Sequence, residues 1–340
     1  MTDRSHTPHR IPGKTSREIE SAVLAIRKEY PAWGGRKIRK VLENRGVEGL
    51  PCAKTCGNIL KRNGCVSEEA SSRNKAFQRF ERALCNELWQ SDFKGDFSLE
   101  DGGRCYPLTI LDDHSRFSPA VVPMPSLKGV TEQFRLVFIE FGLPLAVLVD
   151  NGGTFRGRGS IGFVMFERWL MEHDVLPIHG RVRHPQTQGK IERFHGSMER
   201  EVLKGRTFKD LDDVAQALSS WREVYNTIRP HEAINMRCPA EVYTKSTRPY
   251  DDHVSAFEYS GEFHVIKVNS WGYVRFAGFQ IFISETFADQ FLEFRPNPYR
   301  DSWFACFRNF RIAEFDACSG MLLNRSVWRI CAVNNPIALL

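Results

Sequence analysis

Apolar residues near the start of the chain recur at helical spacing in three short runs separated by turn-forming residues. The runs cover residues 15–29, 36–44 and 53–62. In the second run Ile38, Val41 and Leu42 share one face, which predicts a buried side. Three short helices with a turn before the last one predict a helix-turn-helix domain over residues 1–65, and the polar residues 66–84 are expected to be a linker.

The middle of the chain changes to a strand pattern and then alternates between strand and helix. Three strands, then helix, strand, helix, strand and helix, are expected at residues 88–97, 105–111, 117–124, 128–141, 145–149, 161–173, 176–179 and 187–204. A further amphipathic helix is expected over residues 210–227. The all-apolar run 145–149 is typical of a buried parallel strand. This order predicts a mixed-sheet α/β domain over residues 85–245.

The last third of the chain reads as short strands punctuated by glycine and proline, which predicts a small β-barrel over residues 255–318. From the sequence alone, such a barrel could be a packing or dimerisation module. The chain has no apolar run as long as a membrane span and no signal-peptide core at its N-terminus. Its nine cysteines are odd in number and scattered, which favours reduced thiols. We therefore expect a cytoplasmic protein that is not associated with a membrane.

Positive charge is concentrated at the N-terminus. Residues 1–65 hold 14 Lys and Arg against 6 Asp and Glu, a net charge of +8, so the remainder carries 6 − 8 = −2. A basic domain of this kind suits contact with DNA phosphates, although a solvated basic surface is the plain alternative. The candidate DNA contacts in this domain are Lys37, Lys40, Lys54, Lys61 and Arg62.

Three acidic signatures follow one another along the middle of the chain. They are Trp89-Gln90-Ser91-Asp92, Val147-Leu148-Val149-Asp150-Asn151-Gly152 and Gln188-Gly189-Lys190-Ile191-Glu192-Arg193. The carboxylates of Asp92, Asp150 and Glu192 form an oxygen-ligand set suited to Mg²⁺ or Mn²⁺. Taken singly, they could be a solvent-facing strand residue, an Asx turn and a solvated helix residue. Asp96 and Glu199 are the nearest competing carboxylates, and we expect both to stand outside the site.

These signatures, together with Tyr225-Asn226-Thr227-Ile228-Arg229-Pro230-His231, resemble those of the integrase-core DDE transposases of bacterial insertion sequences, relatives of retroviral integrases. The resemblance covers roughly residues 15–245. It implies a ribonuclease-H-like fold for the core, an SH3-like barrel that helps to hold DNA, and a homo-multimer that bridges two DNA ends. It also implies association with the bacterial nucleoid. The interval between Asp150 and Glu192 is longer than usual in the family, and the excess falls in the basic, glycine-rich residues 156–162.

The resemblance also implies a mechanism. The three acidic residues would bind two Mg²⁺ or Mn²⁺ ions, water would cut the end of the element, and the released 3′-hydroxyl would attack target DNA without a covalent protein intermediate. Contacts to the DNA end are expected from Gln188, Lys190, Arg193, Arg181 and Arg183. Structural support behind the site is expected from Asn226, Arg229 and His231. Asp112 and Asp113 are expected either to support the metal ligands or to form a turn, rather than to bind metal.

Two other functions stay open at this point. The chain could be an inactive DNA-binding remnant that lacks an N-terminal segment, or a nuclease of the ribonuclease H type. A zinc site is not expected, because His6, His9, Cys52 and Cys56 have the wrong spacing. A nucleotide cofactor is not expected either, since the sequence lacks a glycine-rich phosphate loop of the ATP-hydrolase type.

Overall fold

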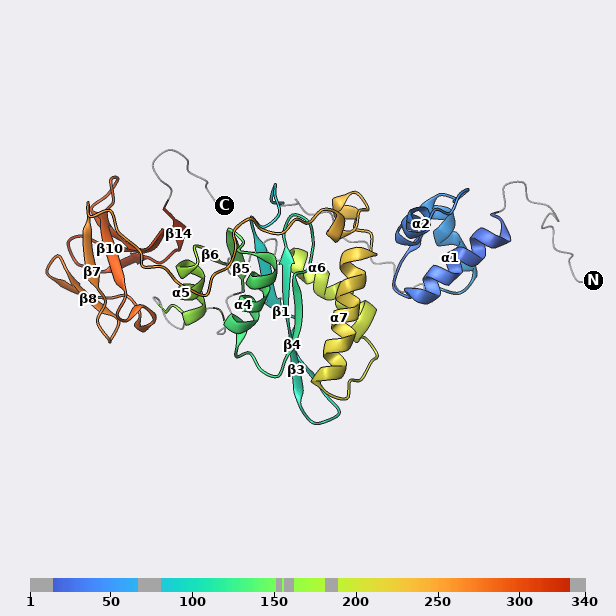
Figure 1. Cartoon of the computed structure of the whole chain (residues 1–340), viewed down its shortest axis with the longest axis horizontal. Coiled ribbons are helices and arrows are strands. Elements are labelled where there is room, and N and C mark those ends of the chain that lie inside the picture. Colours follow the sequence, from blue (N-terminus) through green and yellow to red (C-terminus); the bar gives the residue numbers. More distant parts are fainter. Residues whose placement is uncertain (1–14, 67–80, 151–154, 156–161, 181–188, 331–340) are drawn as a thin grey trace, which may run out of the picture.

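A computed structural model describes residues 15–66, 81–150, 155, 162–180 and 189–330, and it arranges them as three units along one long axis (Figure 1). A helical unit lies at one end, an α/β unit in the middle and a β-rich unit at the other end. Within the described part of the chain, no helix is both long enough and apolar enough to cross a membrane.

The helical unit consists of α1 (Arg17–Glu29), α2 (Gly35–Asn44) and α3 (Ala53–Arg62), as the periodicity predicts. The face of α2 that was predicted to be buried is buried. Helices α2 and α3 cross so closely that a Cβ atom at Gly35 would lie 2.6 Å from the carbonyl oxygen of Ala53, so only glycine fits there. Val224 and Ile228 of the central unit pack against the core of these helices, which docks the helical unit on its neighbour.

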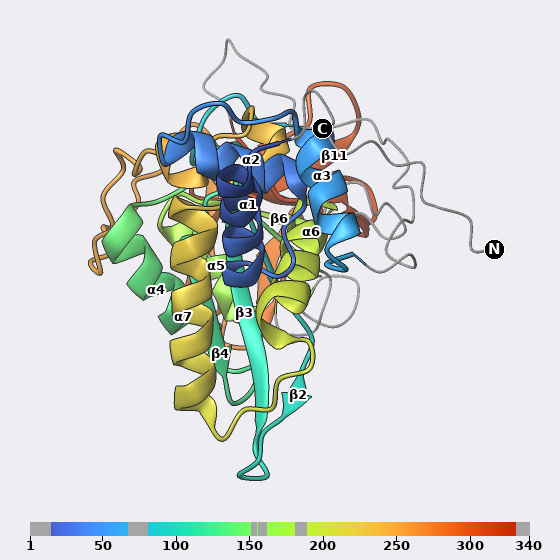
Figure 2. The same cartoon turned by 90° about the vertical axis from the view of Figure 1, so that its right-hand side faces the viewer.

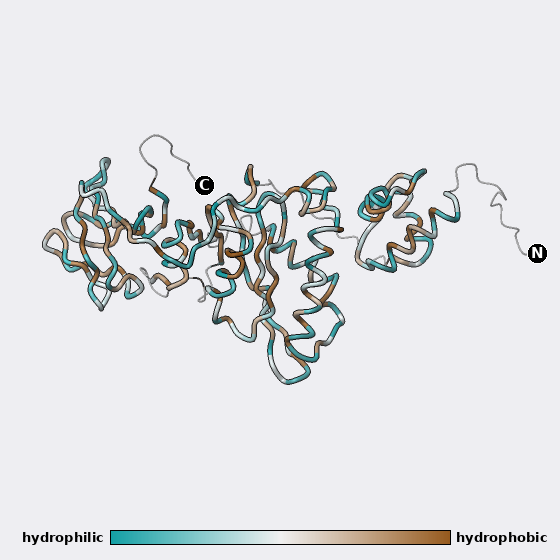
Figure 3. Tube along the Cα trace, in the orientation of Figure 1, coloured by the Kyte–Doolittle hydropathy of each residue, from teal (hydrophilic) through white to brown (hydrophobic). Residues whose placement is uncertain are grey.

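The central unit is built on a six-stranded mixed sheet. Its strands are β1 (Trp89–Phe93), β2 (Phe97–Ser98), β3 (Arg104–Asp112), β4 (Ala120–Met124), β5 (Ala146–Val149) and β6 (Leu176–His179). β3 pairs antiparallel with β1, β2 and β4, whereas β1, β5 and β6 pair in parallel. The mixed α/β sheet is therefore as predicted, although the single strand expected over residues 88–97 is divided into β1 and β2. Hydrophobic residues follow these strands through the middle of the molecule (Figure 3).

Helices cover both faces of this sheet. On one face α4 (Val130–Phe141) and α5 (Met165–Glu172) pack against Trp89, Ile110 and Val147. On the other face α6 (Gly189–Met198) and α7 (Leu211–Thr227) pack against Leu111 and Val121, and Figure 2 shows α6 and α7 in front of the sheet. In α4, α6 and α7 the apolar side of the helix is the buried side, because each helix is held by the side that it turns toward the sheet.

The end of the long helix expected over residues 187–204 differs from a regular α-helix. Residues Glu199–Leu203 form a π-helical turn directly after α6. Glu201 in this turn accepts a hydrogen bond from the Trp221 indole at 3.0 Å and pairs with Arg229 at 3.0 Å. Both members of the Glu201–Arg229 pair are almost fully buried. This pair joins the end of α6 to the segment after α7.

The C-terminal unit contains a second six-stranded sheet and a separate hairpin. The strands are β7 (His264–Lys267), β8 (Tyr273–Phe276), β9 (Phe279–Phe282), β10 (Phe291–Pro296), β11 (Ser302–Phe307), β12 (Phe310–Asp316), β13 (Leu322–Asn324) and β14 (Trp328–Arg329). Sheet order is β13-β12-β11-β10-β7, with β14 also paired to β12, and β8 pairs with β9. β13 and β14 lie beyond residue 318, the predicted end of this domain, so that boundary was too early.

The C-terminal unit and the central sheet share one hydrophobic core. Leu148 of β5, Met171 of α5 and Leu176 of β6 belong to the same cluster as Phe294 and Ile312 of the C-terminal sheet. Three short 3₁₀ turns complete the described chain, at Glu232–Ile234, Pro239–Glu241 and Glu285–Phe287. The shared core makes the edge of the central sheet a junction between the two units rather than a free edge.

Candidate active site

The strands of the central sheet place two of the predicted carboxylates at one edge of the site. Asp92 is the fourth residue of β1, and Asp150 directly follows β5. β1 and β5 are parallel neighbours in which Gln90 is level with Leu148. Continuing that register by two residues brings Asp92 level with Asp150 on strands that are about 4.8 Å apart. Such carboxyl ends of strands are where open α/β sheets gather their functional groups.

The third carboxylate, that of Glu192, comes from the first turn of α6. It shares the electrostatic surroundings of the other two. Burial and the negative charges of Asp150 and Glu192 together raise the pKa of Asp92 to about 6, against a hydrogen bond from the Phe93 backbone that lowers it. The charges of the other two predicted residues therefore act on Asp92.

The two competing carboxylates already have cationic partners. Glu199 pairs with Lys94 at 3.1 Å, and Asp96 pairs with Arg104. By contrast, neither Asp92 nor Glu192 forms an ion pair with any residue that the structure describes. The prediction that Asp96 is exposed is confirmed. Over the same described residues, no group of three or more His, Cys, Asp or Glu side chains is arranged so that it could hold a metal ion.

A histidine that the sequence analysis missed joins α6 to the sheet beside Asp92. His195 Nε2 lies 2.8 Å from Thr109 Oγ1, and the same hydroxyl donates to the Asp92 carbonyl at 2.8 Å. Burial lowers the pKa of His195 to about 4, with a further contribution from Lys94, so the ring is neutral at neutral pH. His195 is one helical turn after Glu192 on the inner side of α6, and that spacing could have identified it.

A second missed histidine contacts the backbone of Asp150. His179 is level with Val149 in the pairing of β5 and β6, and its Nδ1 lies 3.3 Å from the Asp150 carbonyl oxygen. Its Nε2 lies 2.8 Å from Oε1 of Glu167, which is fully buried. His179 is the last residue of β6, and Asp150 is the first residue after β5. Functional groups gather at the carboxyl ends of parallel strands, so this position could have identified His179 from the sequence.

Comparisons with known proteins show which families the chain is similar to. Models of the Integrase core domain match residues 83–185 and 173–239. An uncharacterized 31.7 kDa protein of insertion element IS407 from Burkholderia multivorans is 27% identical over 256 residues, which are 70% of this chain and 87% of that protein. Transposase InsD of insertion element IS2 from Escherichia coli is 25% identical over 250 residues, 67% of this chain and 81% of its own.

The chain thus carries an integrase core and is similar to the transposases of insertion elements. Enzymes of this family are of the polynucleotidyl transferase type. Among solved structures, the catalytic core of HTLV-2 integrase, in complex with magnesium and in a trimeric form, covers 48% of this chain and 99% of its own at 15% identity and a TM-score of 0.36.

The acidic pair at the end of β3 has a structural role in the transposase. Asp112 accepts hydrogen bonds from the backbone and hydroxyl of Ser115 and from the backbone of Asn86, which confirms its turn role. Asp113 is fully buried, accepts from the side chain of Gln90 and pairs with Lys190. Lys190, predicted to contact the DNA end, is therefore partly buried and already paired with a carboxylate.

The motif at the end of α7 contacts both the segment before β4 and the helix α6. The amide of Asn226 accepts from the backbone of Ser118 at 2.9 Å and donates to its carbonyl at 3.0 Å. Arg229 pairs with Glu201 and donates to Ser197 of α6 at 2.9 Å. These contacts tie α7 to the strand edge and to the helix that carries Glu192.

The predicted DNA contacts of the transposase fall into three groups. Arg181, Arg183 and Gln188 lie outside the described residues. Lys40 pairs with Glu43, and Arg62 pairs with Glu20. Lys37 lies at the junction with the central unit, where burial and the positive charge of Arg229 lower its pKa to about 8. Lys54 and Lys61 on α3 and Arg193 on α6 are exposed.

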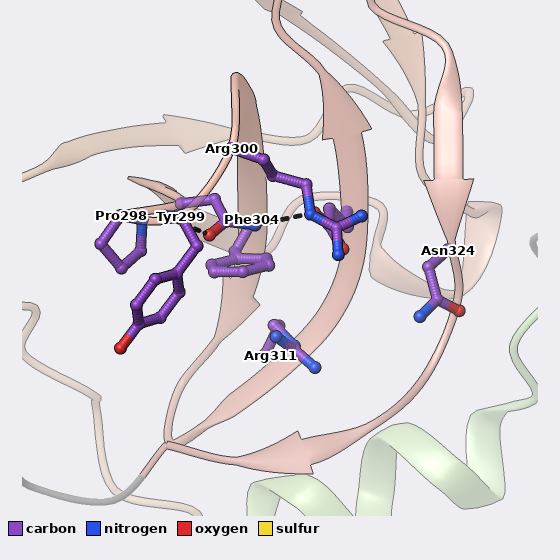
Figure 4. A pocket seen from close by; sticks show the side chains of 8 residues that line it. Pro298, Tyr299, Arg300, Phe304, Arg311 and Asn324 are labelled. Atoms are coloured by element: carbon purple, nitrogen blue, oxygen red, sulfur yellow. Dashed lines mark hydrogen bonds and ion pairs between the residues drawn. The ribbon is translucent and has the colours of Figure 1, made fainter.

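The C-terminal unit carries a hollow of about 390 Å³ with aromatic and basic walls (Figure 4). Its lining residues are Asn297, Pro298, Tyr299, Arg300, Phe304, Arg311, Glu314 and Asn324. The Arg311 guanidinium lies 4.5 Å from the centre of the Phe304 ring, and Tyr299 is almost completely exposed. Arg300 pairs with Glu314, so only part of the positive charge is open to a ligand.

Proposed function

We propose that this transposase cleaves DNA at the ends of its element and joins those ends to target DNA, with Asp92, Asp150 and Glu192 as catalytic residues. The observation that carries the proposal is the state of Asp92. Its carboxylate is largely buried, its pKa is raised to about 6 by burial and by two neighbouring carboxylates, and it forms no ion pair within the described chain. A cation from solution is the simplest way to compensate such a group.

The donor atoms fit Mg²⁺ or Mn²⁺, because all three are carboxylates and hard divalent cations prefer oxygen. Two ions bound there would activate the attacking oxygen and stabilise the leaving oxygen of an in-line displacement. The residues of the chain then need only to bind and orient: Asp92 from β1, Asp150 from the end of β5 and Glu192 from α6. This division of work requires no protein nucleophile.

DNA binding is proposed for the outer units and for the start of α6. α1 to α3 are proposed as a helix-turn-helix domain in which Lys54 and Lys61 face the DNA. In the C-terminal unit, proposed as a small barrel, the exposed Tyr299 and the arginines of the hollow suit phosphates and base faces. The contacts proposed near the site and along the helical unit are Gln188, Lys190, Arg193, Arg181, Arg183, Lys37, Lys40 and Arg62. Assembly on two DNA ends as a homo-multimer and a cytoplasmic location complete the proposal.

A strand-transfer assay tests this function. Duplex oligonucleotides from the DNA that flanks the gene would be incubated with the full chain and Mg²⁺ or Mn²⁺, and joined products would be measured. Asp92→Asn should lower joining by more than the ~10–100-fold typical of residues that only support metal ligands. Asp96→Asn is the matched control, since Asp96 is exposed and already paired with Arg104.

Three further results decide the interpretation. DNA binding by Asp92→Asn, measured by gel shift, should match the wild type. Mg²⁺ should raise the Tm of the wild type and of Asp96→Asn but not of Asp92→Asn, because a ligand that binds the native state stabilises it. Joining by Asp92→Asn at the wild-type rate would contradict the assignment, and a wild type that binds DNA but never joins it would identify a DNA-binding remnant.

A further inference from the structure

A continuous series of polar contacts leads from the C-terminal unit to the backbone of Asp150. Arg325, in the segment after β13, pairs with Oε1 of Glu167 at 3.2 Å. The same oxygen lies 2.8 Å from Nε2 of His179, and Nδ1 of His179 lies 3.3 Å from the Asp150 carbonyl oxygen. The links come from four places in the chain: the C-terminal unit, α5, β6 and the end of β5.

Glu167, in the middle of this series, is buried and therefore depends on its partners for charge compensation. Glu167 is fully buried in the α5 helix, and the Arg325 side chain is only 9% exposed. A buried carboxylate is stable only when a cation and hydrogen bonds compensate it, and here Arg325, His179 and the backbone of Val164 do so. Both ring nitrogens of His179 face oxygen atoms, so Glu167 and the Asp150 carbonyl together define the plane of the ring.

The surrounding contacts fix the position of Arg325 relative to Glu167. The Arg325 guanidinium stacks 4.0 Å from the centre of the Phe163 ring. Phe163 in turn packs on Phe287 of the C-terminal unit, and its carbonyl accepts from the Thr286 hydroxyl at 2.6 Å. The segment that begins α5 is therefore clamped by the C-terminal unit rather than by the central sheet alone.

We propose that Arg325, Glu167 and His179 are positioning residues, through which the docked C-terminal unit sets the backbone at Asp150 and so the direction of its carboxylate. This inference rests on the proposed role of Asp150 in metal binding. Metal-ligand sites lose function when their geometry shifts by about 0.5 Å, and residues behind the ligands typically contribute ~10–100-fold to metal affinity or activity. The C-terminal unit would then serve the chemistry directly, apart from any contact that it makes with DNA.

The matched control lies in the same junction. Arg329 binds both oxygens of Asp174 at 2.7 Å and docks the C-terminal unit on the turn before β6, but its contacts lead to Asp174 and not to Asp150. Arg329→Gln removes a docking ion pair, whereas Arg325→Gln removes the end of the series. A role in docking alone predicts that the two substitutions have the same effect.

The experiment uses the full chain with Arg325→Gln, Arg325→Lys, His179→Asn and Arg329→Gln. We expect Arg325→Gln and His179→Asn to raise the Mn²⁺ concentration needed for half-maximal strand transfer by about 10-fold or more, with gel-shift affinity for DNA unchanged. Their double variant should be less impaired than the product of the single effects, because both act on one series. Arg329→Gln should keep the wild-type Mn²⁺ requirement, and Arg325→Lys should fall between because lysine keeps the charge without the planar fork.

A readout independent of activity accompanies the assay. Amide hydrogen exchange in the peptide that covers β5 and Asp150 should be faster in Arg325→Gln than in Arg329→Gln. Equal Mn²⁺ requirements and equal exchange in these two variants would overturn the inference even if the wild type is fully active. Failure of the wild type to bind Mn²⁺ or to join DNA would instead count against the proposed function. If Arg325→Gln does not fold, Arg325→Lys and His179→Asn decide by the same measurements.

Discussion

Acidic groups have different surroundings in two regions of this transposase. At the junction with the C-terminal unit, the buried Glu167 is paired with Arg325, and the half-buried Asp174 is paired with Arg329. At the candidate site, Asp92 and Glu192 form no ion pair with the described residues, whereas Glu199, in the turn after α6, pairs with Lys94. The junction thus supplies a cation for each of its carboxylates, while the described residues supply none for Asp92 and Glu192.

The difference has a consequence for stability. The folded pKa of Asp92 is raised from 3.8 to about 6, so the folded state binds a proton more tightly than the unfolded state. The stabilisation by the protonated form is complete below pH 4 and is lost as the pH rises to about 6 and above. At neutral pH the ionised site therefore weakens the fold, which is the usual cost of a prearranged active site, and a bound divalent cation should reverse it.

The largest difference is expected between two glutamates, one in α6 and one in the π-helical turn that follows it. Glu192→Gln should lower strand transfer by more than ~100-fold, because it removes a proposed metal ligand. Glu199→Gln should change it by a few-fold at most, since Glu199 is half-exposed and already paired with Lys94. Both rates would be measured at saturating Mg²⁺. Equal losses would show that pairing does not distinguish the catalytic carboxylates.

A smaller effect is expected at His195, which is buried beside the site with a hydrogen bond but no ionic partner. Because its folded pKa is lowered to about 4 from 6.5, the folded state resists protonation. Stability should therefore be full above about pH 6.5 and fall by about 3 kcal/mol as the pH drops below 4. His195→Asn should flatten that acid-side decline in urea unfolding, and an unchanged pH profile would place the titrating group elsewhere.

The smallest effect is expected at two lysine side chains that form no ion pair within the described chain. Within the described chain Lys54 and Lys61 of α3 are exposed and form no ion pair, whereas Arg62 pairs with Glu20. Each of Lys54→Ala and Lys61→Ala should weaken DNA binding a few-fold and reduce the slope of log affinity against log salt by about 1. Arg62→Ala serves as the comparison, and a larger salt effect there would move the DNA face away from α3.

Much of the core and of the site could be predicted from the sequence, because the signals were local. Five apolar positions of α4 repeat at helical spacing and are all buried, and the apolar run before Asp150 is a buried parallel strand. The three acidic residues were chosen from their short motifs, and the structure brings them into one electrostatic field. The ion pair of Lys190 with Asp113 could not be predicted together with its DNA role, because Asp113 is 77 residues away in the chain.

The spacing of apolar residues indicates which faces of α2, α4 and α7 are buried, and short motifs indicate which carboxylates stand at strand ends or on a helix. The side-chain partners became visible only in the folded chain: His195 with Thr109, His179 with the Asp150 backbone, and Arg325 with Glu167. It also added β13 and β14 beyond the expected barrel. The reason is physical: side-chain spacing follows from backbone geometry that each segment carries with it, whereas the pairing of charges depends on which distant segments are packed together.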